Sequence, residues 1–530
     1  MTLLITPFWG IDAINLPKFL VLAGCSICIL GLLVNYLSGY LRNQFRRLSV
    51  GVLSFVLFTI LTFVANSSSS AQFFGAFGRN TGLVAYLGLA IVLLASAIVG
   101  RKSFGRKALY ALILVSLFNM GYGFVQISGR DPIEWPNLNN PIIGTLGNTN
   151  FYSALLGIGA VAVFALILEG GTILSRLSWG VALAGMLFIS YESEAIQGLG
   201  VFLIGAVIVF YYRFLTGRSI FISGSYLVLV SIVFVVSVFG TLRKGPLSGL
   251  LYQESVTYRG DYWSAGWEMT KANPLLGVGM DGYGDWYRAS RTESAALRRG
   301  PDVTTNSAHN VFLDISSNGG FLLLFAYLLI LGLALRSSIL ILKRSKGFDF
   351  VAVGLVSCWV GYLAQSTVSI NQLGLAVWGW VFSGAIIGYQ VYGDEELPVP
   401  KSQRQMIPLN AFITGSLGLI IGFAVSAGPM IQDVTFRSAL ESLDGLKIKS
   451  AALQWPANTY YMDYAADILL QNKLNDLALE LSRESVAKNP RNFNGWKLLF
   501  SNPSATPAEL DQALAKMREL DPFNNTLPES

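Results

Sequence analysis

Long apolar stretches recur along this chain and constrain its fold more than any other feature. An α-helix needs roughly 20 apolar residues to cross the hydrocarbon core of a bilayer. Twelve candidate stretches lie at residues 18–40, 48–65, 82–99, 108–127, 149–168, 177–192, 199–212, 220–240, 311–335, 350–369, 374–392 and 409–428. The chain is 53% hydrophobic and 13% charged, with a mean hydropathy of +0.53, which excludes an ordinary soluble protein. We predict an all-α, polytopic membrane protein of about twelve transmembrane helices.

Short basic clusters follow every second apolar stretch and predict how the chain crosses the membrane. They lie at residues 42–47, 101–107, 176, 213–218, 336–346 and 401–404. Positively charged loops stay in the cytoplasm, so both termini and the long polar loop at 241–310 are expected on the outer side. That loop holds many arginines, but long loops cross regardless of charge. The net charge of +6 therefore reflects topology, and we expect no nucleic-acid partner. The stretch at 199–212 is short enough that a tilted or half-buried helix stays open.

Residues 429–530 differ from the rest because they are polar and helical in pattern. Pro-x-Asn recurs at Pro456, Pro490 and Pro522, at intervals of 34 and 32 residues, with alanine-marked helix pairs between. A two-helix unit of this period resembles the tetratricopeptide repeat. About two units rarely stand alone, so we expect the tail to pack on the membrane domain, a protein partner or a second copy. The predicted domains are a transmembrane domain at 1–428 and an extracytoplasmic helical tail at 429–530.

The single histidine of the chain, His309, stands where the long polar loop meets an apolar span. Its side chain is the one whose ordinary pKa lies near neutrality, which suits acid–base chemistry. Two structural alternatives are an N-terminal helix residue and an interfacial imidazole held by a hydrogen bond. We expect no metal, because one histidine and no dense carboxylate cluster do not make a zinc site. Cys25, Cys28 and Cys358 lie in apolar spans and are expected to be small core residues.

Arginines on the predicted outer face are the candidate anion-binding groups, because the guanidinium fork matches phosphate oxygens. Arg79 and Arg259 each stand beside glycines or aromatic residues in a short stretch next to a membrane span. Other arginines of the long loop are at positions 288, 291, 298 and 299. For most of these, a solvated charge or a contact to a lipid headgroup is the alternative.

Several motifs together resemble the O-antigen ligase and polymerase family. They are Gly144-Thr145-Leu146-Gly147-Asn148-Thr149-Asn150, then Arg259 and Trp263, then Pro274-Leu275-Leu276-Gly277-Val278-Gly279, and finally Ala308-His309-Asn310 with Gly319-Gly320. The resemblance covers most of residues 18–428. The ligase motif is matched by His309, Asn310 and Gly320, but its closing position is Leu323 instead of Gly, Thr or Tyr. A Ser-Arg pair of the family corresponds here to Ser193-Glu194, which lacks the arginine.

The resemblance implies an integral-membrane glycosyltransferase in the bacterial inner membrane, with its site on the outer face. Such enzymes take a glycan from an undecaprenyl-pyrophosphate carrier and need no cofactor. His309 would be the general base, and Arg259, with Arg79, would bind the pyrophosphate. Asn310, Asp261 and Arg288 are the further expected substrate-binding residues. The expected partners are the carrier-linked donor, a glycan, glycolipid or protein acceptor, and membrane lipid.

Two alternatives to a ligase stay open at this point. A polymerase of the same family would join two carrier-linked glycans and differs only in its acceptor. A lipid-glycan transporter or flippase would also suit about twelve spans, but it should show charges at the membrane midplane. The apolar stretches here carry few charges, with Glu192 and Glu194 the main exceptions.

Overall fold

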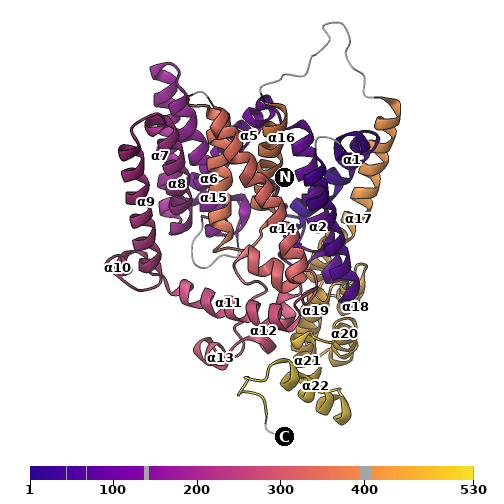
Figure 1. Ribbon diagram of the computed structural model, residues 1–530. Coiled ribbons are helices and arrows are strands. Elements are labelled where there is room, and N and C mark those ends of the chain that lie inside the picture. Colours follow the sequence, from indigo (N-terminus) through magenta and orange to yellow (C-terminus); the bar gives the residue numbers. More distant parts are fainter. Residues whose placement is uncertain (43–44, 67–68, 136–141, 346, 394–407, 529–530) are drawn as a thin grey trace.

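The computed structural model describes residues 1–42, 45–66, 69–135, 142–345, 347–393 and 408–528, and within them every regular element is a helix. Long helices form one bundle, with a group of shorter helices at one end (Figure 1). The bundle helices are α1 (Asn15–Arg42), α2 (Arg46–Ala65), α4 (Leu83–Val99), α5 (Lys102–Ile127), α6 (Thr149–Glu169), α7 (Ile173–Glu192), α8 (Ile196–Phe210), α9 (Ile220–Thr241), α14 (Val311–Arg344), α15 (Phe350–Ser366), α16 (Leu373–Tyr392) and α17 (Leu409–Glu441). The shorter elements of the bundle and loops are α3 (Ser70–Phe74), the 3-10 turn η1 (Gly144–Leu146), the π-turn η2 (Tyr211–Leu215), α10 (Ser248–Leu251), α11 (Glu254–Ala272), α12 (Tyr283–Ser290) and α13 (Glu293–Arg299). The prediction of an all-α polytopic protein is confirmed.

Ten of the described helices are long and apolar enough to cross a membrane, and α4 and α15 are shorter apolar helices. Helices α6 and α16 lie at the centre, with 78% of their most apolar windows buried by protein. Helix α9 lies at the edge, and none of its window is buried, so its apolar side chains are left for lipid. The bundle therefore has a protein core and a lipid-facing rim.

Small residues let the bundle helices approach closely. This is common in membranes, where helices associate mainly through van der Waals packing because lipid is as apolar as their side chains. A Cβ added to Gly388 of α16 would lie 2.3 Å from the Ala97 carbonyl oxygen of α4. A Cβ added to Gly418 of α17 would lie 2.4 Å from the Ile27 carbonyl oxygen of α1. These crossings bring the last two bundle helices against early ones, so the chain closes on itself.

Helix α14 is broken at Gly320, where the large loop enters the bundle. Gly320 has φ 69°, and a Cβ there would lie 2.3 Å from the backbone of Leu275. The Phe321 N–H donates to the Pro274 carbonyl at 2.7 Å, and the Gly279 N–H donates to the Asn318 carbonyl at 3.0 Å. The break thus fastens the turn after α11 to the first half of α14. It explains physically why glycine stands at this position of the ligase motif.

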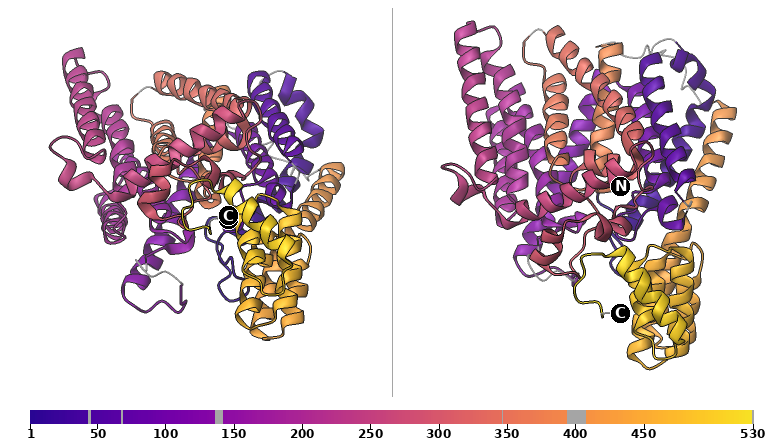
Figure 2. Two further views of the ribbon diagram at one scale, coloured as in Figure 1. Left: turned by 90° about the horizontal axis from the view of Figure 1, so that it is seen from below. Right: turned by 60° about the horizontal axis from the view of Figure 1, so that its bottom comes forward.

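The helical tail consists of α18 (Gly445–Leu453), α19 (Thr459–Gln471), α20 (Asn475–Lys488), α21 (Phe493–Phe500) and α22 (Pro507–Leu520). It continues from α17, so the predicted boundary at 428/429 falls inside that helix, and the domain division stays a prediction. The tail and the loop helices α11–α13 lie at the same end of the bundle (Figure 1). Seen from below, the tail lies away from α9 (Figure 2). The tetratricopeptide resemblance of this segment also stays a prediction.

Buried contacts fasten the tail to the rest of the chain. Asp521 accepts hydrogen bonds from Arg288 at 2.8 Å and from Arg291 at 2.7 Å, and its side chain is fully buried. The Arg491 guanidinium lies 3.5 Å from the centre of the Trp286 ring. The tail thus packs on the large loop of the predicted membrane domain, which is one of the three packing partners expected from the sequence.

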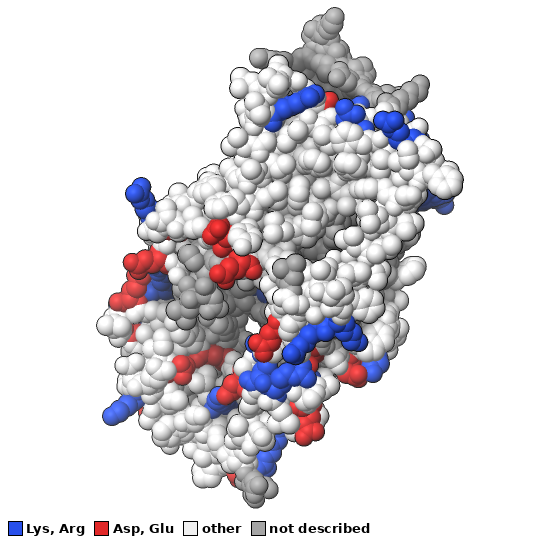
Figure 3. Space-filling model, turned by 90° about the vertical axis from the view of Figure 1, so that its left-hand side faces the viewer, with Lys and Arg blue, Asp and Glu red and all other residues white. Residues whose placement is uncertain are grey.

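The opposite end of the bundle carries basic side chains from the short loops. Lys102 at the start of α5 lies 3.0 Å from Asp349, which precedes α15, and Arg106 pairs with Glu169 at the end of α6. Figure 3 shows basic side chains along the upper end of one face, an uncharged band across it, and a lower end with both signs of charge. This separation of charges is the one that the positive-inside rule produces.

Candidate functional site

His309 is the last loop residue before Asn310, which is the N-cap of α14. Its backbone has φ 52°, an uncommon value for a residue other than glycine. The His309 N–H donates to Ser307 Oγ at 3.0 Å, and Ser307 Oγ donates to Asp314 Oδ2 at 2.7 Å. The Ala308 N–H donates to Asp314 Oδ1 at 2.8 Å. A buried carboxylate in the first turn of α14 therefore fixes the backbone that carries the imidazole.

Arg79 completes this support from the other side of the loop. Its guanidinium is 5% exposed and lies 3.1 Å from Asp281 and 3.7 Å from Asp314. It also donates to the Asn306 carbonyl at 2.7 Å. Protein groups thus surround Arg79, and its position favours holding the histidine loop in place over the substrate-binding role expected from the sequence.

The His309 imidazole is half-buried beside Tyr262, with ring centres 5.2 Å apart. Burial is the largest cause that lowers the pKa of His309, to about 4, and the charges of Arg259, Arg79 and Arg299 lower it further. At neutral pH the imidazole is therefore uncharged and able to accept a proton.

Arg259 on α11 is a half-buried guanidinium without a carboxylate partner in the part of the chain that the structure describes. Burial lowers its pKa, as expected for a cation removed from water without a counter-charge. Arg299, at the end of α13, also lacks an acidic partner within the described ranges. It donates to the Tyr262 hydroxyl and lies 4.0 Å from the centre of the Tyr258 ring. Two guanidinium groups without a carboxylate partner among the described residues thus act electrostatically on His309.

The remaining predicted site residues have other contacts. Asp261 pairs with Arg298 at 3.1 Å, at the edge of the cluster. The Asn310 Oδ1 accepts from the N–H groups of Phe312 and Leu313, so this atom caps α14. Arg288 is 9% exposed and is held by Asp521 of the tail and by the Pro301 carbonyl. Its Nη1 is thus engaged within the protein, and the substrate-binding role expected of Arg288 stays a prediction.

Arg299 and Tyr262 were not singled out from the sequence. Arg299 stands among four arginines between positions 288 and 299, and sequence alone offers no reason to separate it from Arg298. Asp314 carried a usable signal, because an acidic residue at the start of an apolar span needs a partner when it is buried. Its side chain is fully buried, and its partners Arg79 and Ser307 lie in the loop regions before it.

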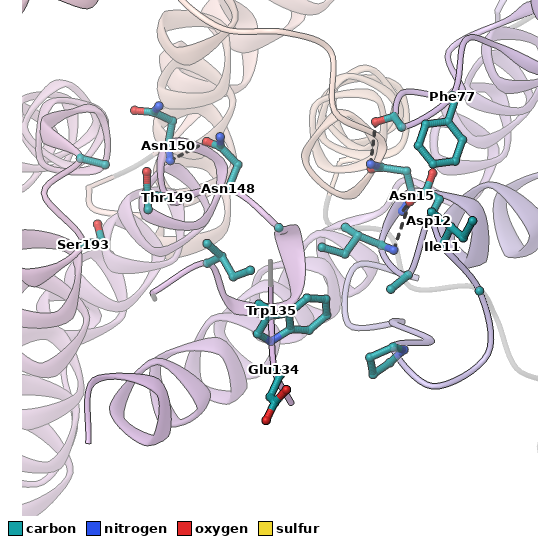
Figure 4. A pocket seen from close by; sticks show the side chains of 18 of the residues that line it. Ile11, Asp12, Asn15, Phe77, Glu134, Trp135, Asn148, Thr149, Asn150 and Ser193 are labelled. Atoms are coloured by element: carbon teal, nitrogen blue, oxygen red, sulfur yellow. Dashed lines mark hydrogen bonds between the residues drawn. The ribbon is translucent and has the colours of Figure 1, made fainter. Parts of the chain in front are cut away.

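A cavity of about 810 Å³ opens among loop segments and helix ends (Figure 4). Gly78 and Ser255 in its lining stand close in sequence to Arg79 and Arg259. It lies between the N-terminal segment, the 77–78 turn, the start of α6 and residues 193–195. The last four residues of the family-like segment 144–150 line the cavity: Gly147, Asn148, Thr149 and Asn150. Glu194, which stands where the family has arginine, also lines it and has φ 58°.

The fold and the site define a multi-pass membrane protein with an arginine-surrounded histidine at one end of its bundle. Residues 179–328 match the family model described as O-antigen ligase, from within α7 through the large loop into α14. This part of the chain is therefore similar to the O-antigen ligase family. No curated protein matches the chain.

Proposed function

We propose that this protein transfers a glycan from an undecaprenyl-pyrophosphate carrier to an acceptor hydroxyl, at the outer face of the bacterial inner membrane. One observation carries the proposal: Arg259 and Arg299, which have no carboxylate partner among the described residues, act electrostatically on the half-buried His309. A proton acceptor next to an anion-binding pair is what displacement of a pyrophosphate requires. The family match supports glycan and lipid-linked substrates.

The reaction is a direct displacement at the anomeric carbon. His309 accepts the proton of the acceptor hydroxyl, and the acceptor oxygen forms a bond to the anomeric carbon. The bond from that carbon to the carrier phosphate breaks, and the pyrophosphate leaves with the electron pair. Arg259 and Arg299 stabilise the charge that develops on the leaving group. The anomeric configuration of the transferred sugar is inverted, and no metal or nucleotide takes part.

Binding of the donor also prepares the base. In the free protein the arginines and burial keep the pKa of His309 at about 4, which makes it a weak proton acceptor. A bound pyrophosphate neutralises the nearby guanidinium charges, so it raises the pKa of the imidazole toward the working pH. The histidine thus becomes an effective base when the leaving group is in place.

Buried positioning residues hold this arrangement. Asp314 and Asp281 bind Arg79, and together they fix the backbone from Asn306 to His309. The location of the cluster at the end opposite the basic loops supports a site that faces outward. The cluster lies just before the first turn of α14, which supports a site where an acceptor from water and a carrier from lipid meet.

The proposed function is tested with purified protein in lipid nanodiscs and synthetic undecaprenyl-pyrophosphate-linked oligosaccharide. Products are separated by mass. A ladder of added repeat units identifies a polymerase, and single transfer to an added glycolipid or protein acceptor identifies a ligase. No product with either acceptor would contradict the proposal.

A further inference from the structure

The side chains that line the cavity take no part in the proposed transfer mechanism. Its volume of about 810 Å³ falls within the range of small-molecule sites, about 300–1,000 Å³. In Figure 4, Trp135 and Glu134 lie between Asn148, Thr149 and Asn150 on one side and Asp12, Asn15 and Phe77 on the other. The cavity is thus bounded by an aromatic ring, side-chain amides and carboxylates.

Trp135 is held rigidly as a half-exposed platform. Its indole N–H donates to the Tyr122 hydroxyl at 2.9 Å, and that hydroxyl donates to Asp131 at 2.9 Å. Asp131 also accepts from Gln126 at 3.0 Å. Because this network occupies the polar edge of the indole, its apolar face is left for contact with a ligand.

Hydrogen-bonding groups around the platform are free to bind a ligand. The side chains of Thr149, Asn150 and Gln253 line the cavity and have no intramolecular hydrogen bond within the described residues. Amide and hydroxyl groups both donate and accept, which matches the hydroxyl groups of a sugar. The combination of an aromatic face and such groups suits a pyranose ring, whose C–H face is apolar and whose rim is polar.

The charges of the wall disfavour phosphate. Arg437 is the basic residue among the lining side chains of the described chain, and it donates to the Pro7 and Gly10 carbonyls and to Glu441. Glu134 and Glu194 are exposed and have no ion-pair partner in the part that the structure describes. Anionic ligands are therefore repelled, whereas uncharged or ammonium-bearing ligands are not.

The elements that line the cavity also carry the arginine cluster. Ser255 lines the cavity and stands four residues before Arg259 on α11, so both lie on one face of that helix. Gly78 lines the cavity and directly precedes Arg79. A chain of sugars in the cavity would therefore extend toward the proposed pyrophosphate site.

We propose that this cavity binds sugar units of the glycan substrate, either neutral or amino sugars, with Trp135 as their stacking platform. The proposal rests on the proposed function for its place in the reaction, but the binding itself needs no catalysis. The sugar units belong either to the donor or to the acceptor, since both present the same chemistry.

The test applies fluorescently labelled protein in nanodiscs to a printed array of neutral, amino-sugar and uronic-acid oligosaccharides. Wild type should retain neutral or amino-sugar glycans, and Trp135→Ala should lower the retained signal at least tenfold. Trp9→Ala is the matched control, because Trp9 is 65% exposed and does not line the cavity. His309→Asn should bind as wild type does, because glycan binding needs no base. Wild type that retains glycans on the array but gives no product in the transfer assay would refute the proposed function and leave the cavity proposal standing.

The transfer assay then distinguishes the two sources of sugar. Trp135→Ala should raise the KM of the substrate that occupies the cavity, donor or acceptor, and leave the other unchanged. Three results would overturn the cavity proposal: no glycan retained by wild type, preferential retention of uronic acids, or equal retention by Trp135→Ala and wild type.

Discussion

Replacing Asp521 by Asn should release the helical tail from the large loop while preserving the shape of the side chain. The carboxylate is fully buried, 2.8 Å from Arg288 and 2.7 Å from Arg291. Removing one member of a buried ion pair costs about 3–5 kcal/mol, because the remaining charge is left uncompensated. Since about 1.4 kcal/mol is a tenfold change, opening of this contact should become on the order of 10²–10⁴-fold more frequent.

Hydrogen–deuterium exchange of the purified protein measures that opening. Amides of α12 and α22 should exchange faster by this factor in Asp521→Asn, while those of the central helix α6 keep their protection. Lys497→Ala is the matched control, because its pair with Asp302 crosses the same interface at the exposed surface and contributes about 0–1 kcal/mol. Unchanged exchange of α12 and α22 in Asp521→Asn would refute the role of this ion pair.

Three further predictions concern the site and the topology. The kcat/KM of wild type should rise with pH through a midpoint at about 4, because His309 must be unprotonated to act as the base. The midpoint of kcat should be higher, because the bound pyrophosphate raises the pKa of His309. A kcat/KM midpoint at pH 6.5 or above would contradict this prediction. Arg259→Lys should lower kcat more than it weakens donor binding, because lysine lacks the two-pronged guanidinium group. The control Arg298→Lys should keep a kcat near that of wild type, because Arg298 pairs with Asp261. Equal kcat values for the two variants would show that Arg259 is only a charged loop residue. Cysteines placed at Ser294 and Ser504, in a background without Cys25, Cys28 and Cys358, should both react with an impermeant thiol reagent from the outer side, and labelling of only one would refute the shared side.

The bundle was predictable from the sequence because membrane insertion depends on local composition. A helix that exposes its side chains to lipid must be apolar along about 20 residues, and each such stretch is visible without knowledge of its neighbours. The break of α14 at Gly320 was not visible in this way. It depends on the approach of Leu275, which lies 45 residues earlier in the chain.

Part of the site was predictable for a similar reason. His309 stands out as the single histidine at a boundary, and Arg259 stands among aromatic residues. The roles of the other arginines depend on partners far away in sequence: Arg288 binds Asp521 of the tail, and Arg79 binds Asp281 and Asp314. The sequence alone does not distinguish an arginine that binds phosphate from one that binds a carboxylate far away in the chain, because only the fold shows which carboxylate is near.

The central claim is that His309 is the base of a glycan transfer, and His309→Asn tests it most directly. Asn keeps a hydrogen-bonding side chain of modest size but cannot accept a proton near neutral pH. The carrier-dependent transfer assay, with the melting temperature measured on the same preparation, should show a loss of about two to four decades in rate at unchanged stability and donor binding. A stable His309→Asn variant with near wild-type transfer would leave the protein without a base and contradict the mechanism.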